Sequence, residues 1–264
     1  MNASKMLTSL VLLFFVDAAS AQAPIFTKDD TLRGSITPQR AWWDLTYYHL
    51  KVKVDPAAKH IAGSNEIRYK VLSPGAELQI DLQPPLVLEK AEQDGQSLDI
   101  ARQGRNAYFI RLKKEQPAGS QQSVTVWYSG KPKEAEHAPW DGGFSWSQDE
   151  KGQPFVATSC QGLGASVWWP CKDHAYDEPD SQAISVTVPA NLMDVSNGRL
   201  RHTTDNSDGT RSFDWFVKNP INNYGVNVNI AAYTHFADTL HGEKGVLTMD
   251  YYVLPKNLEK AQKQ

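Results

Sequence analysis

Polar and apolar side chains alternate with a period of two along most of the chain. In the segment TYYHLKVKVD, residues 46–55, apolar side chains occupy every second position: Tyr48, Leu50, Val52 and Val54. Lysines fill two of the positions between them, which is the pattern of a strand with one buried face. The segment AGSNEIRYKVL repeats the pattern with Ile67, Tyr69 and Val71. The turn-forming residues DPAAKH between the two segments predict a β-hairpin.

Seven further segments show the same alternation of β-branched or aromatic side chains with polar ones. They are ELQIDL (77–82), NAYFIRL (106–112), QSVTVWYSG (122–130), SQAISVTVP (181–189), RSFDWFVKNP (211–220), YGVNVNIAAYTHF (224–236) and GVLTMDYYVLP (245–255). No window before residue 255 carries the apolar i, i+3, i+4, i+7 stripe of an amphipathic helix. The sequence therefore predicts an all-β domain built from several antiparallel or mixed sheets.

The two ends of this predicted β domain, which we place at residues 41–254, differ from it in composition. Residues 22–40 hold scattered Pro and Gly among mixed charges, and we expect an extended lead-in there. Residues 255–264 are rich in helix formers, with Asn257 at a suitable N-cap position, and predict the start of a helical segment. That helix would end after about two turns. So short a helix favours a truncation just after a domain boundary over a natural C-terminus, although a natural C-terminus can have the same sequence pattern.

The first 21 residues have the features of a secretory signal. Lys5 gives a weakly positive start, Leu7–Val16 form an apolar run, and Ala19-Ser20-Ala21 offers the small residues that a signal peptidase reads. The run of about 10 residues is too short to span a bilayer. We therefore expect cleavage near Ala21 and export of the mature protein to the periplasm or beyond. A buried N-terminal helix is the alternative interpretation of the same run.

Composition and charge narrow the classes of partner. Hydrophobic residues make up 41% of the chain and charged residues 22%, which is ordinary for a globular protein. The formal net charge is −3, so no long-range positive field favours nucleic acid or anionic lipid. No segment after the N-terminal run is apolar enough to predict a membrane span.

The segment CQGLGASVWWPCKDHAYDEPD, residues 160–180, concentrates the residues with chemical potential. It contains both cysteines of the chain, Cys160 and Cys171. In an exported protein these two form a disulfide or remain two buried thiols, and the sequence leaves both open. A bridge across so small a loop would stabilise the fold by roughly 2–3 kcal/mol. Trp168 and Trp169, directly before Pro170, predict an aromatic packing corner.

A metal site or a pair of catalytic carboxylates in this segment is the less favoured interpretation. Cys160, Cys171, His174 and Asp177 would have to supply the ligands, but zinc usually takes closely spaced pairs and these cysteines are 11 positions apart. The acidic residues of Asp-Glu-Pro-Asp (177–180) suit acid–base work, but Pro179 makes a turn that leads into a strand the simpler interpretation. The glycine-rich loop PWDGGFSW, residues 139–146, connects strands and is also placed to flank a cleft.

Complete catalytic signatures are missing from the sequence. It has no His-Glu-x-x-His, no Gly-x-Ser-x-Gly and no Gly-Lys-Ser/Thr phosphate-binding loop. The sequence therefore predicts no metal ligands and no catalytic residues within the chain itself.

Three segments together make the chain resemble the N-terminal part of an aminopeptidase N-like zinc metallopeptidase, of the gluzincin group that includes the leukotriene hydrolase. The first is residues 160–180 followed by SQAISVTVP, and the second is VSNGRL, residues 195–200. The third is WFVKNPINNYGVNVNIAAY, in which an aromatic, a Pro and a Tyr precede a strand. The resemblance covers about residues 40–255, and the Trp-Trp-Pro and PWDGGF variants are similar to secreted bacterial members.

The resemblance implies a saddle-like all-β domain beside a catalytic domain that carries the zinc, its His-Glu-x-x-His helix and its Gly-x-Met-Glu-Asn loop. In such enzymes a zinc-bound water, activated by a glutamate, removes residues from the N-terminus of a peptide. The β domain lines one side of the cleft, and the position that holds the substrate's free amino group corresponds to Gln161. The implied partners are therefore a peptide N-terminus and the protein's own catalytic domain. Residues 1–264 alone are expected to be inactive and to bind no zinc.

A function of a different class also fits the sequence. The chain would then be a free-standing secreted module, without catalysis, that binds a peptide or a protein on its β domain. A carbohydrate-binding β-sandwich that uses tryptophans is a weaker alternative, because most of the tryptophans lie in strand or Pro-rich packing contexts.

Overall fold

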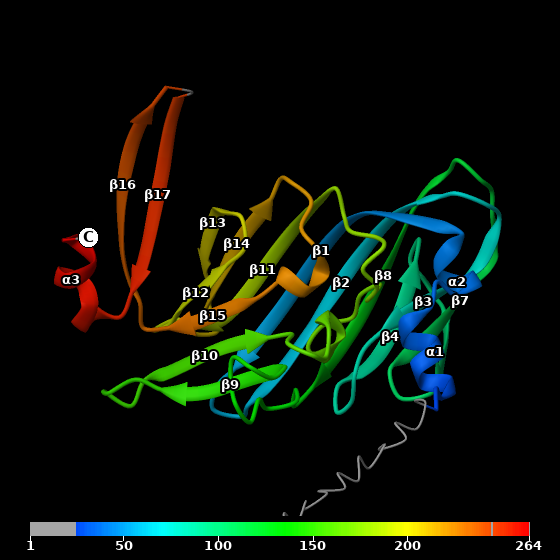
Figure 1. Cartoon of the computed structure of the whole chain (residues 1–264), viewed down its shortest axis with the longest axis horizontal. Coiled ribbons are helices and arrows are strands. Elements are labelled where there is room, and N and C mark those ends of the chain that lie inside the picture. Colours follow the sequence, from blue (N-terminus) through cyan, green and yellow to red (C-terminus); the bar gives the residue numbers. More distant parts are fainter. Residues whose placement is uncertain (1–24, 244, 264) are drawn as a thin grey trace, which may run out of the picture.

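The computed structural model describes residues 25–243 and 245–263, and strands dominate it (Figure 1). Seventeen strands in this part form four sheets, and no helix there exceeds seven residues. The predicted all-β fold is therefore confirmed. None of the helices in the described part has the length and apolar character needed to cross a membrane. The signal-peptide prediction for residues 1–21 lies outside the described residues.

The largest sheet has eight strands in the order β13-β14-β11-β1-β2-β8-β4-β5. Neighbours are antiparallel except β1 and β11, which run parallel. The strands are β1 (Trp43–Asp55), β2 (His60–Val71), β4 (Val87–Gln93), β5 (Gln96–Ser97), β8 (Gln121–Gly130), β11 (Ser181–Pro189), β13 (Arg199–Asp205) and β14 (Thr210–Val217). The predicted hairpin is β1–β2.

Three smaller sheets complete the fold, in the orders β12-β15-β10-β9, β3-β7-β6 and β16-β17. Their strands are β3 (Gly75–Asp81), β6 (Asp99–Gln103), β7 (Ala107–Gln116), β9 (Gly143–Gln148), β10 (Pro154–Ser159), β12 (Met193–Ser196), β15 (Val228–Ala231), β16 (Thr234–Gly242) and β17 (Gly245–Val253). Three 3-10 turns are η1 (Ala165–Val167), η2 (Asn223–Gly225) and η3 (Pro255–Asn257). In Figure 1 the β16–β17 hairpin stands away from the other sheets.

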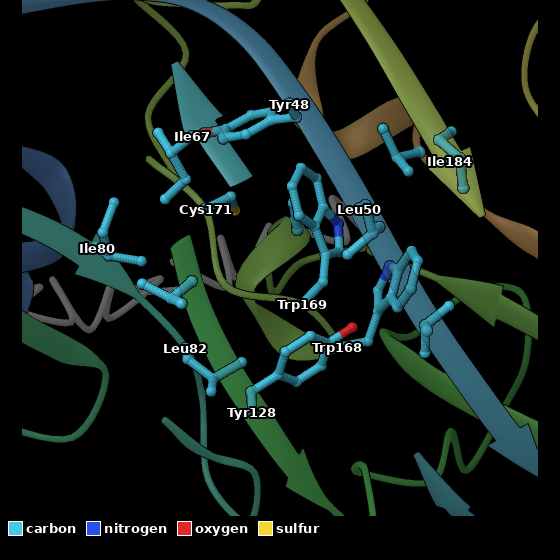
Figure 2. Packing of buried hydrophobic residues seen from close by; sticks show 14 of the residues in the cluster. Tyr48, Leu50, Ile67, Ile80, Leu82, Tyr128, Trp168, Trp169, Cys171 and Ile184 are labelled. Carbon is cyan, nitrogen blue, oxygen red and sulfur yellow. The ribbon is translucent and has the colours of Figure 1, made fainter. Parts of the chain in front are cut away.

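The core lies between the large sheet and the smaller ones, and the residues predicted to face it do so. Tyr48 and Leu50 on β1 and Ile67 on β2 are fully buried. Trp168 and Trp169 form the predicted aromatic corner: the Trp169 ring meets Tyr48 edge-on, with centroids 5.1 Å apart. Figure 2 shows this cluster between β1 and β8. The corner thus joins the segment 160–180 to the large sheet.

The lead-in is not extended, so this part of the prediction is wrong. It contains α1 (Lys28–Gly34) and α2 (Pro38–Ala41). Thr27 and Asp30 form a capping box at the start of α1, in which each side chain accepts a hydrogen bond from the other residue's backbone N–H. Pro38 occupies the first turn of α2, where its missing N–H has no cost. The helical structure of this segment therefore depends on local capping, because the segment has no apolar periodicity.

Two other boundaries differ from the sequence prediction. The segment 224–236 was expected to be one strand, but the chain leaves β15 at Ala231 and enters a different sheet at Thr234. The predicted helical segment at the C-terminus is present as η3 followed by α3 (Leu258–Gln262). Asn257 stands at the N-cap position, but its side chain makes no capping hydrogen bond.

Asp194 on β12 is an acidic group buried without a positive partner among the described residues. Its Oδ2 accepts a hydrogen bond of 2.9 Å from the indole Nε1 of Trp215, and its Oδ1 has no partner there. Burial raises the pKa of the Asp194 carboxyl well above its usual value, against the smaller opposite effect of the Trp215 hydrogen bond. Burial therefore favours the neutral form of this carboxyl in the folded protein.

We expect this group to make stability decline with rising pH. Below the unfolded-state pKa of about 4, the carboxyl is protonated in both states. Above it, only the unfolded chain releases the proton, so the free energy of unfolding falls by up to about 1.4 kcal/mol per pH unit until the folded-state pKa is reached. Asp194→Asn should remove this decline in urea unfolding between pH 4.5 and 7.5. An unchanged slope, or the same effect in the exposed control Asp99→Asn, contradicts the prediction.

Candidate functional site

The segment 160–180 connects β10 to β11 and has little regular structure of its own. It begins with a tight turn, in which the carbonyl of Cys160 accepts hydrogen bonds from the N–H groups of Leu163 and Gly164, at 3.0 and 2.9 Å. After η1 and the tryptophan corner, Cys171 forms an isolated β-bridge with Asp81 on β3. The segment is therefore exposed at its turn and anchored in the core behind it.

The Asp173 carboxylate fixes the back of this turn. It accepts hydrogen bonds from the N–H groups of Ala165 (3.2 Å) and Ser166 (3.0 Å) and from the Ser166 hydroxyl (2.6 Å). Gly164 has φ +80, and a Cβ there would lie 2.5 Å from Asp173 Oδ2. Glycine is therefore required at this position, both for its backbone conformation and for the close approach of the carboxylate.

A buried ion pair between Arg40 and Asp81 connects the lead-in to this segment. Arg40 Nη2 lies 2.5 Å from Asp81 Oδ2, and neither side chain is more than 5% exposed. The same carboxylate oxygen accepts a bond from the Asp173 N–H at 3.2 Å. Arg40 Nη1 also donates to the carbonyls of Arg33 (3.1 Å) and Ser35 (2.8 Å). This ion pair therefore holds four parts of the chain together: the end of α1, the helix α2, the strand β3 and the segment 160–180.

A second buried pair, Lys172 with Asp177, holds the far end of the segment. Lys172 Nζ lies 2.5 Å from Asp177 Oδ2 and 2.7 Å from the Trp43 carbonyl, and the lysine side chain is fully buried. Burial lowers the pKa of Lys172 to about 8, although Asp177 acts in the opposite direction. Asp177 also accepts from the Leu45 N–H at 3.2 Å. The carboxylate that could have served acid–base chemistry is therefore engaged in a structural contact.

The two cysteines are buried free thiols, so the disulfide that the sequence left open is not formed. Cys160 closes the exposed turn, whereas Cys171 lies beside Asp81 in the core. Burial raises the pKa of the Cys160 thiol to about 12 and that of Cys171 well above its usual value. Burial and the raised pKa values therefore disfavour the thiolate, which both nucleophilic attack and metal binding require.

A zinc site in this segment, the less favoured interpretation of the sequence, would need side chains that the structure engages in other contacts. His174 Nε2 bonds the Gly34 carbonyl at 3.2 Å, and its Nδ1 accepts from the Tyr176 N–H at 3.2 Å. Asp177 is paired with Lys172, and burial raises the pKa of both thiols. Over residues 25–243 and 245–263, no three His, Cys, Asp or Glu side chains gather closely enough to hold a metal.

Gln161 lies exposed at the tip of the turn, directly after Cys160. Its side-chain Oε1 accepts a hydrogen bond from the Tyr224 hydroxyl, and its backbone N–H donates to Ser159 Oγ at 3.2 Å. Tyr224 belongs to η2, where Asn222 Oδ1 accepts from the Gly225 N–H at 2.9 Å. An amide oxygen has two lone pairs, so this carbonyl keeps the capacity to accept one further bond.

A cavity of about 650 Å³ opens beside this turn. Three segments that are distant in sequence line it: the lead-in with α1, the segment 160–180, and η2. Lining side chains include Phe26, Arg33, Asp173, His174, Asn223 and Tyr224. Arg33 also donates to the Gly162 carbonyl at 3.3 Å, so α1 contacts the turn directly. The cavity therefore begins where the exposed Gln161 turn ends.

Residues 139–142 of the segment PWDGGFSW flank the turn on another side, whereas residues 143–146 belong to β9, so the glycine-rich loop is shorter than predicted. The Pro139 carbonyl accepts from Ser159 Oγ at 3.1 Å, and a Cβ on Gly142 would lie 3.0 Å from the Gln161 carbonyl. Trp140 in this loop is 81% exposed.

The sequence did not identify the contribution of Arg33 or the Tyr224 contact to Gln161. Tyr224 lies within the third resemblance segment, which was the one available signal.

Comparisons with known proteins agree with this architecture. Residues 45–224 match the family description "Peptidase M1 N-terminal domain". A mutant M1 zinc metallopeptidase from Deinococcus radiodurans, bound to a Tyr-Ser-Ala substrate, shares the fold with a TM-score of 0.67 and 19% identity; the match covers 83% of this chain and 50% of that one. Leukotriene A4 hydrolase from Saccharomyces cerevisiae matches with a TM-score of 0.63 and 17% identity, over 84% of this chain and 33% of that one. No curated protein matches the sequence significantly.

We expect Lys172→Met to destabilise the protein by about 3–5 kcal/mol, because it leaves the Asp177 carboxylate buried without its partner. Urea or thermal unfolding of the variant measures this loss. The exposed pair Lys53–Asp208, whose nitrogen and oxygen lie 3.0 Å apart, provides the matched control. Lys53→Met should change stability by no more than about 1 kcal/mol. Equal effects of the two substitutions would show that burial of the Lys172 pair is not decisive.

We expect neither cysteine of the folded protein to react with Ellman's reagent at pH 8, because burial keeps both thiols protonated. Two thiols should appear per chain when the protein is unfolded in guanidinium without any reductant. Absence of titratable thiols under those conditions would instead establish a disulfide between Cys160 and Cys171. A rapid reaction in the folded state would contradict their burial.

Proposed function

The chain belongs to the M1 peptidase family, and on this basis we propose that it is the N-terminal, cleft-lining domain of an exported zinc-dependent aminopeptidase. The family match carries the proposal, because it spans the segment 160–180 and reaches Tyr224. These are the parts of the chain that meet at the exposed Gln161 turn. The resemblance and the exposed Gln161 turn support the proposed substrate class, which is peptides with a free N-terminus.

The chain spans about half the length of the M1 zinc metallopeptidase that it resembles. A structurally similar M1 zinc metallopeptidase is described as a two-domain enzyme. We assign zinc and the catalytic residues to a second domain, because the candidate ligands within the described part of this chain are otherwise engaged. In this arrangement the β domain binds and orients the peptide, and the metal chemistry takes place on the other side of the cleft.

Gln161 is the residue that we assign to the peptide's N-terminal ammonium group. Gln161 is exposed, and its amide oxygen already accepts from Tyr224, which orients the side chain. An amide carbonyl accepts a hydrogen bond from an ammonium group, though less strongly than a carboxylate would. The backbone behind Gln161 is held by the Cys160 turn and by Asp173, so the group is positioned by the fold before any ligand binds.

The glycine-rich loop and the cavity beside α1 extend this surface on two sides. Exposed Trp140 and Tyr224 offer aromatic faces for apolar side chains of a peptide. Export, with cleavage near Ala21, is the part of the proposal that rests on the N-terminal sequence alone. Mass spectrometry of the secreted protein tests it directly, since the mature chain should begin at Gln22.

The Gln161 assignment predicts a binding defect. In the complete enzyme, Gln161→Ala should raise KM for peptide substrates by about tenfold or more, because a hydrogen bond to a charged group is lost. The turnover number should change much less, because the contact exists equally in the ground state and the transition state. Gln161→Glu should lower KM, and the distant exposed Gln96→Ala should leave it unchanged. Steady-state kinetics on a panel of aminoacyl-anilides measures these effects.

The same panel of substrates tests whether the zinc site and the catalytic residues lie in the second domain. Purified residues 22–264 should bind no stoichiometric zinc and hydrolyse none of the substrates. Zinc-dependent turnover by this chain alone would overturn the assignment of the chemistry to a second domain. An unaltered KM in Gln161→Ala, with an active complete enzyme, would overturn only the role of Gln161.

A further inference from the structure

The side chain of Gln161 ends in an amide whose two ends have opposite hydrogen-bonding character. The carbonyl oxygen accepts hydrogen bonds, whereas the NH2 group donates them. A half-turn about the last side-chain bond exchanges the two ends with little change in shape, because this torsion is roughly two-fold. An ammonium group has donors alone, so it needs the oxygen. An exposed glutamine that binds such a group therefore needs a neighbour that fixes which end of the amide faces the ligand.

The backbone of the Gln161 turn is already fixed, which leaves the amide orientation as the remaining freedom. The Gln161 N–H donates to Ser159 Oγ at 3.2 Å, and the Cys160 carbonyl accepts two backbone bonds within the turn. On the other side, Arg33 donates to the Gly162 carbonyl at 3.3 Å. None of these contacts involves the amide group of the glutamine side chain.

The Tyr224 hydroxyl is the group that contacts this amide, and it donates to Gln161 Oε1. A phenolic oxygen shares its lone pairs with the ring, so a tyrosine hydroxyl donates more strongly than it accepts. The contact therefore favours the orientation in which Oε1, and not the NH2 group, lies beside the tyrosine. Tyr224 is 48% exposed and lines the cavity, so a ligand can reach the second lone pair of Oε1 next to the ring.

The position of Tyr224 is itself set by contacts on both sides of it in η2. Asn222 Oδ1 accepts from the Gly225 N–H at 2.9 Å and closes the turn. Asn223 is 4% exposed, and its Nδ2 donates to the Lys172 carbonyl at 2.8 Å. The tyrosine is thus anchored to the segment 160–180, which also carries Gln161, so the two side chains keep their relative position.

We propose that Tyr224 is a positioning residue, whose hydroxyl selects the amide orientation in which Gln161 presents its carbonyl oxygen to the ammonium group of a peptide. This inference rests on the proposed function, which assigns that ammonium group to Gln161. Without the hydroxyl the amide populates both orientations, and one of them sets the partly positive NH2 hydrogens against the ammonium group. A carboxylate at this position would need no such partner, because both of its oxygens accept.

Tyr224→Phe in the complete enzyme tests the proposal, because it removes the hydroxyl and keeps the ring. We expect KM for peptide substrates to rise by about threefold to tenfold, which is the range for loss of one oriented hydrogen bond. The turnover number should change little, because the ammonium contact exists in the ground state as well as in the transition state. Tyr47→Phe is the matched control, because Tyr47 lies on β1 with Arg68 over its ring and outside the cavity lining.

The same substitution in two further backgrounds separates positioning from a general structural effect. In the Gln161→Glu background, Tyr224→Phe should change KM by less than about twofold, since either carboxylate oxygen accepts. In the Gln161→Ala background it should add nothing to the increase already present. An equal rise of KM in all three backgrounds, together with a lower midpoint of thermal unfolding, would identify a structural role and overturn the proposal.

The outcomes distinguish this inference from the proposed function. If Gln161→Ala raises KM and Tyr224→Phe leaves it unchanged, Tyr224 is not the positioning residue, while the role of Gln161 stands. If neither substitution alters KM in an active enzyme, the ammonium group is held elsewhere and both assignments fail, while the peptidase activity stands. A folded, zinc-loaded complete protein that cleaves no peptide overturns the proposed function and this inference with it.

Discussion

The buried ion pair between Arg40 and Asp81 is the contact on which the surroundings of the candidate site depend. Asp81 accepts bonds from Arg40, from the Gln79 side chain at 3.0 Å and from the Asp173 backbone. Arg40 in turn holds two carbonyls at the end of α1. Burial raises the pKa of Asp81, and Arg40 only partly opposes this. Removing either member would leave a desolvated charge at the point where α2, β3 and the segment 160–180 meet.

This arrangement places a rigid support behind an exposed group. Asp173 and the tryptophan corner fix the turn from within, while Gln161 and Trp140 remain available to solvent. The polar groups of the segment that look most reactive in the sequence are those used for support: the two thiols, His174 and Asp177. The groups of the segment and its surroundings that remain exposed are a neutral amide and aromatic rings, neither of which takes part in proton transfer.

The sequence predicted what depends on repeated local pattern, and it missed what depends on contacts between distant segments. The alternation in β1 and β2 predicted the hairpin, because burial of one strand face places an apolar residue at every second position. The adjacent tryptophans predicted the packing corner. The helices of the lead-in are too short for periodicity and depend on the Thr27–Asp30 cap. The contact of Tyr224 with Gln161 joins η2 to the turn after β10, two segments far apart in the sequence, and neither residue type signals the other. The state of the cysteines was likewise open until their separate surroundings were known.

The parallel pairing of β1 with β11 has a consequence for how the site forms. Lys51 lies opposite Ser185, so two strands from distant parts of the sequence must meet before the large sheet is continuous. Contacts of such long sequence separation form slowly, because the intervening chain loses entropy before any of them is made. The segment 160–180 ends where β11 begins, and its Lys172–Asp177 pair rests on the Trp43 carbonyl at the start of β1. We therefore expect the exposed Gln161 turn to be completed late in folding, so that substitutions along this seam affect the rate at which folded protein appears as much as its final stability.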